Sequence, residues 1–234
     1  MLKTSDQIVN FPYNGKSKTY SDILKSSCHH FLYGMFTESS PDVVCLALKN
    51  ILLMPGKEVI IMEMTLLQLI QSWHNPVLDK IMVVVFNDFV GAKGEIWVIL
   101  GLILFLIPKT RRCGICVLVS YLLAYFIGDG ILKELIGRVR PCNADPSVPL
   151  IVKRPSSYSC PSVHSMLAFA SAVSVFMSNK KSGIFTLVFA ALIGFSRMYF
   201  FVHYPTDVLF GALLGTLIGL CSSLLIEREI SSRK

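Results

Sequence analysis

A histidine and an aspartate follow an arginine near the end of a long apolar stretch of this sequence. Arg197 comes directly after Ser196, five residues separate it from His203, and Asp207 follows four residues after His203. Ionisable groups inside apolar stretches are costly and usually serve a function. A carboxylate beside an imidazole fixes the ring proton and raises the basicity of the other nitrogen, as a histidine nucleophile or base requires. The alternative is polar decoration of a membrane interface around Pro205.

A second group of polar residues begins another apolar stretch. Ser162 is a suitable N-cap residue for a helix, and His164 would lie in the first turn of that helix. The N-terminus of a helix carries free N–H groups and the positive end of the helix dipole, so it attracts anions. Ordinary capping beside a solvated histidine would explain the same residues.

A third group is basic and ends a further apolar stretch. Lys133 and Arg140 are seven residues apart, nearly two helical turns, so they would share one face of a helix that continued that far. Gly137 and Pro141 favour the end of such a helix. Snorkelling of basic side chains toward water is one alternative, and simple pairing of Lys133 with Asp129 is another.

Together these groups supply three cations, a hydroxyl, a helix N-terminus, two histidines and a carboxylate. The combination suits phosphoryl transfer, because the transition state spreads negative charge over three oxygens that cations and N–H groups stabilise. One histidine could attack the phosphorus, and the other could protonate the leaving oxygen.

Membrane-spanning helices are the elements that would position these groups. Five apolar segments are expected to span a membrane: residues 96–107, 113–132, 163–177, 183–202 and 208–226. A sixth is expected near residues 43–73, where each of two apolar runs, 43–54 and 59–70, falls short of the roughly 20 residues that a span needs. These two runs could lie in the membrane interface instead.

Composition supports a membrane protein. Hydrophobic residues make up 53% and charged residues 16% of the 234 residues, which excludes an ordinary soluble domain and a disordered chain. Basic residues gather at 109–112, at 180–181 and at 228–234, on the same side of the alternating spans, and the positive-inside rule makes that side cytoplasmic. The C-terminus is therefore expected in the cytoplasm and the three polar groups on the opposite face, and the formal charge of +7 needs no nucleic-acid partner.

The three groups resemble the signature of the type 2 phosphatidic acid phosphatase superfamily, the membrane lipid-phosphate phosphatases. The motif K-x6-R-P matches Lys133–Pro141, P-S-G-H matches Pro161–His164 with Val163 in place of glycine, and S-R-x5-H-x3-D matches Ser196–Asp207. The resemblance covers about residues 73–226, and the stretch 73–82 is similar to bacterial undecaprenyl diphosphate phosphatase-like members.

The resemblance implies an all-α, multi-pass bundle of about six membrane helices with its active site at the non-cytoplasmic face. In the family mechanism, His203 is the nucleophile that forms a phospho-histidine, Asp207 orients it, and His164 is the general acid. The residues implied to bind the phosphate are Lys133, Arg140, Ser162, Val163 and Arg197. Neither a metal ion nor another cofactor is expected, because the three cations replace it.

The implied reaction is hydrolysis of a lipid phosphate monoester or diphosphate, such as a polyprenyl diphosphate, phosphatidate or phosphatidylglycerophosphate. The alternatives are a lipid phosphotransferase, a lipid A phosphatase of the same superfamily, or a non-catalytic membrane relative. Val163 favours the last of these, because its branched side chain restricts the backbone and adds bulk beside the phosphate. The expected partners are the lipid substrate and the bilayer, and the sequence does not reveal the oligomeric state.

We expect residues 1–57 to form a polar to interfacial leader without a cleaved signal peptide, and residues 58–234 to form the phosphatase domain. The stretch 73–82 favours a bacterial inner membrane, with the site facing the periplasm or exterior, although an endoplasmic reticulum membrane with a lumenal site fits the same topology. Cys142 and Cys160 flank the loop before His164, where both a disulfide and two free thiols are consistent with the sequence. Cys113 and Cys116 are interpreted as small packing residues at a helix start.

Overall fold

The computed structural model describes residues 11–13, 16–18, 56–91 and 93–232. Residues 43–54 and most of the leader, whose structure was predicted above from the sequence, therefore lie outside the described residues. The chain divides into two compact units, Met1–Gly56 and Lys57–Lys234. In the first unit, strands β1 (Phe11–Tyr13) and β2 (Lys16–Lys18) pair in antiparallel register, with Phe11 opposite Lys18.

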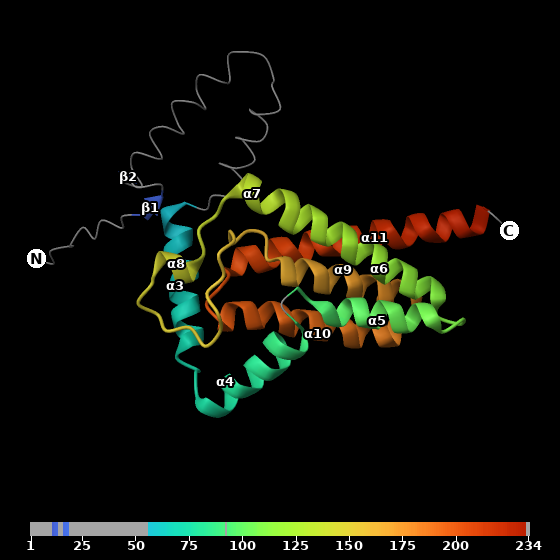
Figure 1. Cartoon of the computed structure of the whole chain (residues 1–234), viewed down its shortest axis with the longest axis horizontal. Helices are drawn as coiled ribbons and strands as arrows, with labels where there is room; N and C mark the ends of the chain where they lie inside the picture. Colours follow the sequence, from blue (N-terminus) through green and yellow to red (C-terminus); the bar gives the residue numbers. More distant parts are fainter. Residues whose placement is uncertain (1–10, 14–15, 19–55, 92, 233–234) are drawn as a thin grey trace, which may run out of the picture. The chain divides into compact units, whose positions relative to one another are not determined.

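The described part of the second unit is built from helices, as the sequence predicted (Figure 1). In chain order they are α3 (Lys57–Gln71), α4 (Pro76–Val83), η1 (Val84–Phe89), α5 (Glu95–Leu106), α6 (Arg111–Tyr125), η2 (Phe126–Leu132), α7 (Lys133–Ile136), α8 (Pro141–Ala144), α9 (Val163–Ser178), α10 (Lys180–Tyr199) and α11 (Pro205–Ser232). The two segments η1 and η2 are wider π-helical turns that continue α4 and α6. The all-α fold is thus confirmed for this unit.

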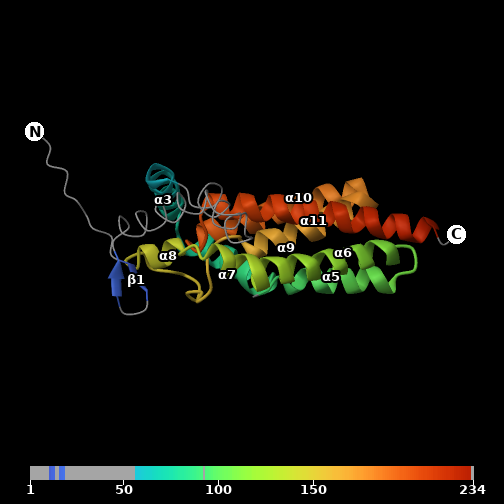
Figure 2. The same ribbon diagram turned by 90° about the horizontal axis from the view of Figure 1, so that it is seen from above.

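Helix α9 is the centre of the bundle and packs against α6, α10 and α11 (Figure 2). The face of α11 toward α9 carries three glycines at four-residue intervals, here named the glycine ridge: Gly211, Gly215 and Gly219. A Cβ atom added to any of them would lie 2.3–2.5 Å from a carbonyl oxygen of α9, that of Ser162 in the case of Gly211. Small residues at this spacing let two helix backbones approach closely. The glycine ridge therefore fixes where the first turn of α9 lies beside α11.

The opposite side of α11 is apolar and exposed. Leu209, Leu213 and Leu217 precede the ridge glycines by two residues each, roughly 200° around the helix, and their exposed fractions are 62%, 65% and 56%. A stripe of exposed leucines is unfavourable in water and favourable against lipid chains. This arrangement is that of a helix embedded in a bilayer.

Several helices are long and apolar enough to cross a membrane. In the part of the chain that the structure describes, three helical stretches meet both conditions, namely Arg111–Ala144, Lys180–Tyr199 and Pro205–Ile226, and two shorter apolar helices are Glu95–Leu106 and Val163–Ser178. All five expected spans therefore coincide with apolar helices, while the total of about six remains a prediction.

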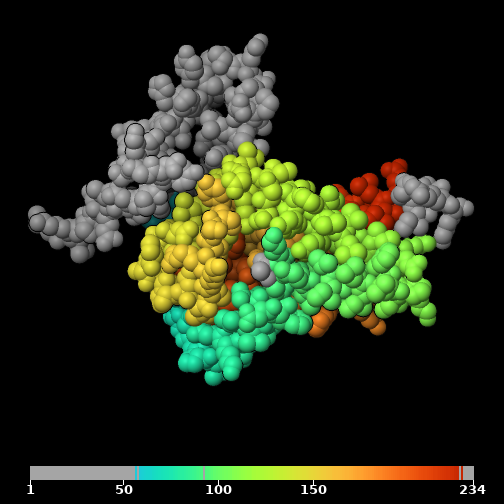
Figure 3. Space-filling view, in the orientation of Figure 1, coloured from blue at the N-terminus to red at the C-terminus, as the bar shows by residue number. Residues whose placement is uncertain are grey.

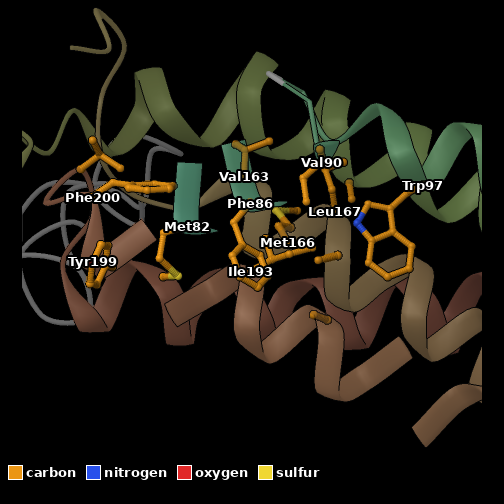
Figure 4. Close-up of a cluster of buried hydrophobic side chains, with 14 of the residues drawn as sticks. Met82, Phe86, Val90, Trp97, Val163, Met166, Leu167, Ile193, Tyr199 and Phe200 are labelled. Atoms are coloured by element: carbon orange, nitrogen blue, oxygen red, sulfur yellow. The ribbon is translucent and has the colours of Figure 1, made fainter. Parts of the chain in front are cut away.

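A buried apolar cluster joins α4 and η1 to α9 and α10. Figure 4 shows Phe86 beside Met166 and Ile193, with Val163 at the same level of the cluster and Met82 on the side of Tyr199 and Phe200. Burial of aliphatic and aromatic side chains is the main stabilising contribution of such a contact, about 1.5–3 kcal/mol for each fully buried side chain. The cluster holds η1 against the start of α9.

The helix that carries Lys133 does not continue as far as Arg140. Helix α7 ends at Ile136, and Gly137 follows in the left-handed region with φ 63°, a conformation that favours glycine. Arg140 is extended, with φ −71° and ψ 152°, and precedes Pro141. The two basic side chains are therefore carried by different backbone segments.

Candidate active site

Lys133 and Arg140 converge on one serine in the loop before α9. Lys133 Nζ donates to Ser157 Oγ at 3.2 Å, and the Arg140 guanidinium donates to the same Oγ at 3.0 Å and to the Ser157 carbonyl at 2.7 Å. Lys133 also pairs with Asp129 at 2.7 Å, the helical partner expected one turn earlier. Both cations are buried, which is costly unless partners or an anion compensate the charge. Although the helix ends before Gly137, the two cations thus still meet at Ser157.

Arg140 also contacts the ring of His203. Its Nη1 lies 3.0 Å from His203 Nε2 and donates to the Val202 carbonyl at 2.9 Å. Because a guanidinium can only donate, Nε2 must be the ring nitrogen with the free lone pair, and the proton must be on Nδ1. Burial and the charge of Arg140 together lower the pKa of His203 to about 3. His203 is therefore neutral at physiological pH, as a nitrogen nucleophile must be.

Asp207 lies behind His203, but its carboxylate accepts hydrogen bonds from other groups. Its Oδ2 is 3.8 Å from His203 Nδ1, which is longer than a hydrogen bond, and Nδ1 is buried with no hydrogen-bond partner among the described residues. The Oδ2 atom accepts from Ser159 Oγ at 2.5 Å and from the Tyr204 N–H at 2.9 Å, and Oδ1 accepts from Arg138 at 2.6 Å. Asp207 is thus held beside the protonated ring nitrogen by three donors.

Ser162 and His164 occupy the first turn of α9. Ser162 is the N-cap residue by position, but its side chain makes no capping bond to the described helix and instead lies 2.9 Å from Ser165 Oγ. Its own N–H donates to the Asp207 carbonyl at 3.1 Å. The first N–H groups of α9 are therefore not capped by Ser162 and are available to an anion.

From the first turn of α9, His164 contacts the segment that follows η1. Its Nε2 is 3.4 Å from the Gly91 carbonyl, and because a carbonyl only accepts, this contact requires a proton on Nε2. The positive charges of Arg197 and Lys133 both act on His164. The structure thus brings both histidines into one electrostatic environment, although they belong to different helical ends.

Arg197 is fixed from the side of η1. Its guanidinium donates to the Phe86 carbonyl and, at 3.0 Å, to Ser196 Oγ, and it lies 4.9 Å above the ring of Phe200. The side chain is buried, with 5% of its surface exposed. A third buried cation is therefore present on the α10 side of the site.

Val163, which stands where the resembling family has glycine, directs its side chain into the apolar cluster. Its exposed fraction is 7%, and a Cβ atom added to Gly128 would lie 3.3 Å from Val163 Cγ2. The branched side chain thus fills space against η2, and its backbone N–H remains at the start of α9.

The space-filling view shows a hollow over this region (Figure 3). Its rim is formed by the yellow loop between α8 and α9 on one side and by the green segment around η1 and α5 on the other, and its floor is formed by orange and red atoms of the last helices. The site is thus reached from outside the bundle and is not sealed within it.

Four contributors to the site were not singled out from the sequence. Ser157 and Ser159 lie in the polar loop before α9, and Arg138 lies inside the Lys133–Pro141 motif. Glu63 binds Arg138 from α3 at 2.5 Å. A lone carboxylate in an apolar helix was the available signal for Glu63, and the sequence interpretation treated it only as an interruption of a possible span.

The cysteines beside the site are free and buried thiols. This applies to both Cys142 and Cys160, so of the two pairing states consistent with the sequence the structure has the unpaired one. Burial raises the pKa of the Cys160 thiol above its usual value, which keeps it protonated.

Comparison with known proteins identifies the family. The model of the PAP2 superfamily matches residues 114–231, which include all three sequence motifs of the site. Helices α3 and α4, at the edge of the site, precede the matched residues. The chain belongs to the PAP2 superfamily. This agrees with the resemblance noted from the three sequence motifs.

Two of the similar proteins are undecaprenyl-diphosphatases by name. An undecaprenyl-diphosphatase of Sulfolobus acidocaldarius is 31% identical over 128 residues, which cover 54% of this chain and 62% of the relative, so the match spans less than two thirds of that protein. Undecaprenyl-diphosphatase BcrC of Bacillus subtilis is 30% identical over 152 residues, 63% of this chain and 75% of the relative.

A solved structure is also similar. It is a transmembrane PAP2-type phosphatidylglycerolphosphate phosphatase from Bacillus subtilis, with a TM-score of 0.62 and 26% identity, and the match covers 87% of this chain and 96% of the other. Together with the apolar helices described above, this likeness identifies the present chain as an integral membrane protein.

Proposed function

We propose that this PAP2 protein hydrolyses a lipid phosphate monoester or diphosphate through a phospho-histidine intermediate on His203. The observation that carries the proposal is the contact of Arg140 with His203 Nε2 at 3.0 Å. At this contact, the free lone pair of the neutral His203 ring faces the buried guanidinium of Arg140. A phosphate oxygen that took the place of Nε2 on Arg140 would bring its phosphorus next to the nucleophile.

The first half of the proposed reaction cleaves the bond to the lipid. The Nε2 lone pair attacks phosphorus, the bond from phosphorus to the lipid oxygen breaks, and His164 gives its proton to that oxygen. Lys133, Arg140 and Arg197 stabilise the charge on the three equatorial oxygens, and the N–H groups of Val163 and its neighbours in α9 add to them. The phospho-imidazole keeps its Nδ1 proton facing Asp207.

The second half releases phosphate. His164, now without the proton it gave away, takes one from a water molecule, and the water oxygen attacks phosphorus as the bond to Nε2 breaks. The products are inorganic phosphate and the dephosphorylated lipid, and both histidines return to their starting states.

The donor set supports a reaction without a metal ion. The groups expected around the phosphate are cations and N–H donors, which repel a divalent cation and replace its charge. Among the described residues, no three His, Cys, Asp or Glu side chains gather at one point as metal ligands. Metal independence is the property that chelation tests directly.

The substrate class follows from the site and from the relatives together. Three buried cations suit a head group with more than one negative charge, and the names of the relatives point to polyprenyl diphosphates and phosphatidylglycerophosphate. The distribution of basic residues supports a site at the non-cytoplasmic face, with the lipid tail in the adjoining leaflet.

The test is phosphate release by the purified protein in detergent with EDTA, measured for polyprenyl diphosphate, phosphatidate and phosphatidylglycerophosphate. We expect release in the presence of EDTA, no release by His203→Ala, and wild-type release by Arg112→Met, which removes an exposed arginine at the start of α6, the end of that helix away from Lys133. Retained activity in His203→Ala, or loss of all activity with EDTA that Mg²⁺ restores, would refute the proposed mechanism.

A further inference from the structure

A buried guanidinium joins two buried carboxylates behind the proposed nucleophile. Arg138 donates from Nη1 to Asp207 Oδ1 at 2.6 Å and from Nη2 to Glu63 Oε2 at 2.5 Å. The exposed fractions are 6% for Arg138, 3% for Glu63 and 0% for Asp207. Arg138 is not part of the family signature quoted above, and Glu63 lies outside the residues that the family model matches.

Glu63 also holds the residue next to Asp207. Its Oε1 accepts from the Thr206 N–H at 3.1 Å and from Thr206 Oγ1 at 2.5 Å, while Thr206 Oγ1 accepts from Arg138 at 2.7 Å. One carboxylate on α3 therefore fixes both the guanidinium and the first turn of α11. The guanidinium also lies 4.0 Å above the ring of Tyr204, which adds a second restraint.

The backbone of Arg138 contributes to the same arrangement. Its carbonyl accepts from the Ser159 N–H at 2.8 Å, and Ser159 Oγ donates to Asp207 Oδ2. The guanidinium thus fixes one oxygen of Asp207 directly, and the main chain of the same residue fixes the other through Ser159. Asp207 has little freedom to move relative to Arg138.

The second carboxylate determines how Arg138 binds the first. A guanidinium facing a single carboxylate usually binds it with two N–H groups. Here Nη2 is taken by Glu63, so only Nη1 reaches Asp207, and Oδ2 stays on the side of His203, 3.8 Å from Nδ1. Without Glu63, the second N–H group of Arg138 would be free to compete with Ser159 and the Tyr204 N–H for Oδ2 and so draw the carboxylate away from the ring.

We infer that Glu63 is a positioning residue for the reaction: acting through Arg138, it keeps the Asp207 carboxylate aimed at His203. This inference rests on the proposed phosphatase function. It gives α3, which precedes the matched family region, an effect on the proposed nucleophile through Arg138 and Asp207, because Asp207 stabilises the charge that the ring gains when Nε2 bonds to phosphorus.

The first experiment compares Glu63→Gln with Glu58→Gln in the phosphate-release assay. Glu58 is an exposed glutamate on the same helix, so the substitution is chemically identical. We expect Glu63→Gln to lower kcat by about 10- to 100-fold with little change in KM, because the phosphate-binding cations are unaltered while the nucleophile is misaligned. Glu63→Asp should recover part of kcat, and Glu58→Gln should equal the wild type. Unchanged kcat in folded Glu63→Gln would overturn the inference.

A double-mutant cycle tests whether Glu63 acts through Arg138. In an Arg138→Met background, Glu63→Gln should cause no further loss of kcat, because the guanidinium that transmits its effect is gone. If both substitutions lowered kcat by independent factors that multiply, Glu63 would have only a general structural role and the inference would fail.

A readout without turnover separates this inference from the proposed function. In ¹⁵N-histidine-labelled full-length protein in detergent, the Nδ1–H resonance of His203, assigned by its loss in His203→Gln, should shift in Glu63→Gln and remain in place in Glu58→Gln. An unshifted resonance in Glu63→Gln would refute the positioning role. If instead the resonance shifts but the wild type releases no phosphate from any lipid, the proposed function fails while the positioning of His203 stands.

Discussion

Adding one methyl group to the glycine ridge tests whether the ridge positions the first turn of α9. In Gly211→Ala the new Cβ atom would lie 2.5 Å from the Ser162 carbonyl oxygen, whereas ordinary contact begins at 3.4 Å. The two helices must therefore separate by about 0.9 Å at this level, since the opposing atom is backbone and cannot rotate away.

This separation has two measurable costs. Overpacking of a close helix contact destabilises a protein by about 1–3 kcal/mol, which should lower the unfolding temperature. Displacement of a reacting group by about 1 Å can lower the rate about 100-fold, and Ser162 belongs to the proposed phosphate site. Gly219→Ala offers the comparison, because its Cβ atom would lie an equal 2.5 Å from the Ala170 carbonyl oxygen, two turns further along α9.

The assay measures phosphate release and thermal unfolding in the same detergent for Gly211→Ala, Gly219→Ala and Gly130→Ala. Gly130 is exposed and an added Cβ atom meets nothing within 4 Å, so it is the matched neutral substitution. We expect both ridge variants to lose similar stability and Gly211→Ala alone to lose most of its kcat. If Gly219→Ala lost as much kcat as Gly211→Ala, or if Gly211→Ala behaved as the wild type, the ridge would not be what positions Ser162.

Three further outcomes follow from the site. Arg140→Lys should lower kcat/KM by about 100-fold, because a single ammonium cannot reach the Ser157 oxygens and His203 together, while Arg112→Lys in the same assay should have no effect; equal activity of both variants would contradict this geometry. Because the pKa of His203 is about 3 in the fold and about 6.5 in an unfolded chain, the folded state binds fewer protons between these values, and the free energy of unfolding should fall by up to ~1.4 kcal/mol per unit as the pH drops from 6.5. Chemical unfolding at pH 6.5, 5.5 and 4.5 measures this slope, which should be smaller in His203→Gln, and an equal slope in that variant would assign it elsewhere. Val163→Gly should retain kcat within about threefold and lose about 1–2 kcal/mol of stability by removing a buried side chain, and a large gain in kcat would instead show that valine restricts the site.

The sequence was sufficient to predict the five long apolar helices, but not the shorter α4 and η1. Long apolar segments have few alternatives to membrane helices, so residues 183–202 and 208–226 correspond closely to α10 and the apolar part of α11. Spacing within a motif likewise predicted that His203 and Asp207 would be neighbours. Both are local properties, which a sequence expresses directly.

Contacts between distant segments were not predictable in the same way. The spacing of Lys133 and Arg140 suggested one helix face, but the left-handed Gly137 separates them and a serine 17 residues after Arg140 brings them back together. Glu63 reaches Arg138 across 75 residues, and no local pattern relates the two. Such pairs depend on how helices pack, which the glycine ridge and the apolar cluster determine only once the whole bundle is formed.

The contact between Arg140 and His203 also governs what the resting protein can react with. While the guanidinium occupies the Nε2 lone pair, an uncharged electrophile has nothing to offer Arg140 in exchange and meets a shielded ring. An anionic substrate can displace Nε2 from Arg140, because its oxygen is a better acceptor for a buried cation than a neutral imidazole is. In the proposed mechanism, the negative charge of the substrate thus exposes His203, so the protein selects its substrate chemically at the reacting atom, before any part of the lipid is recognised.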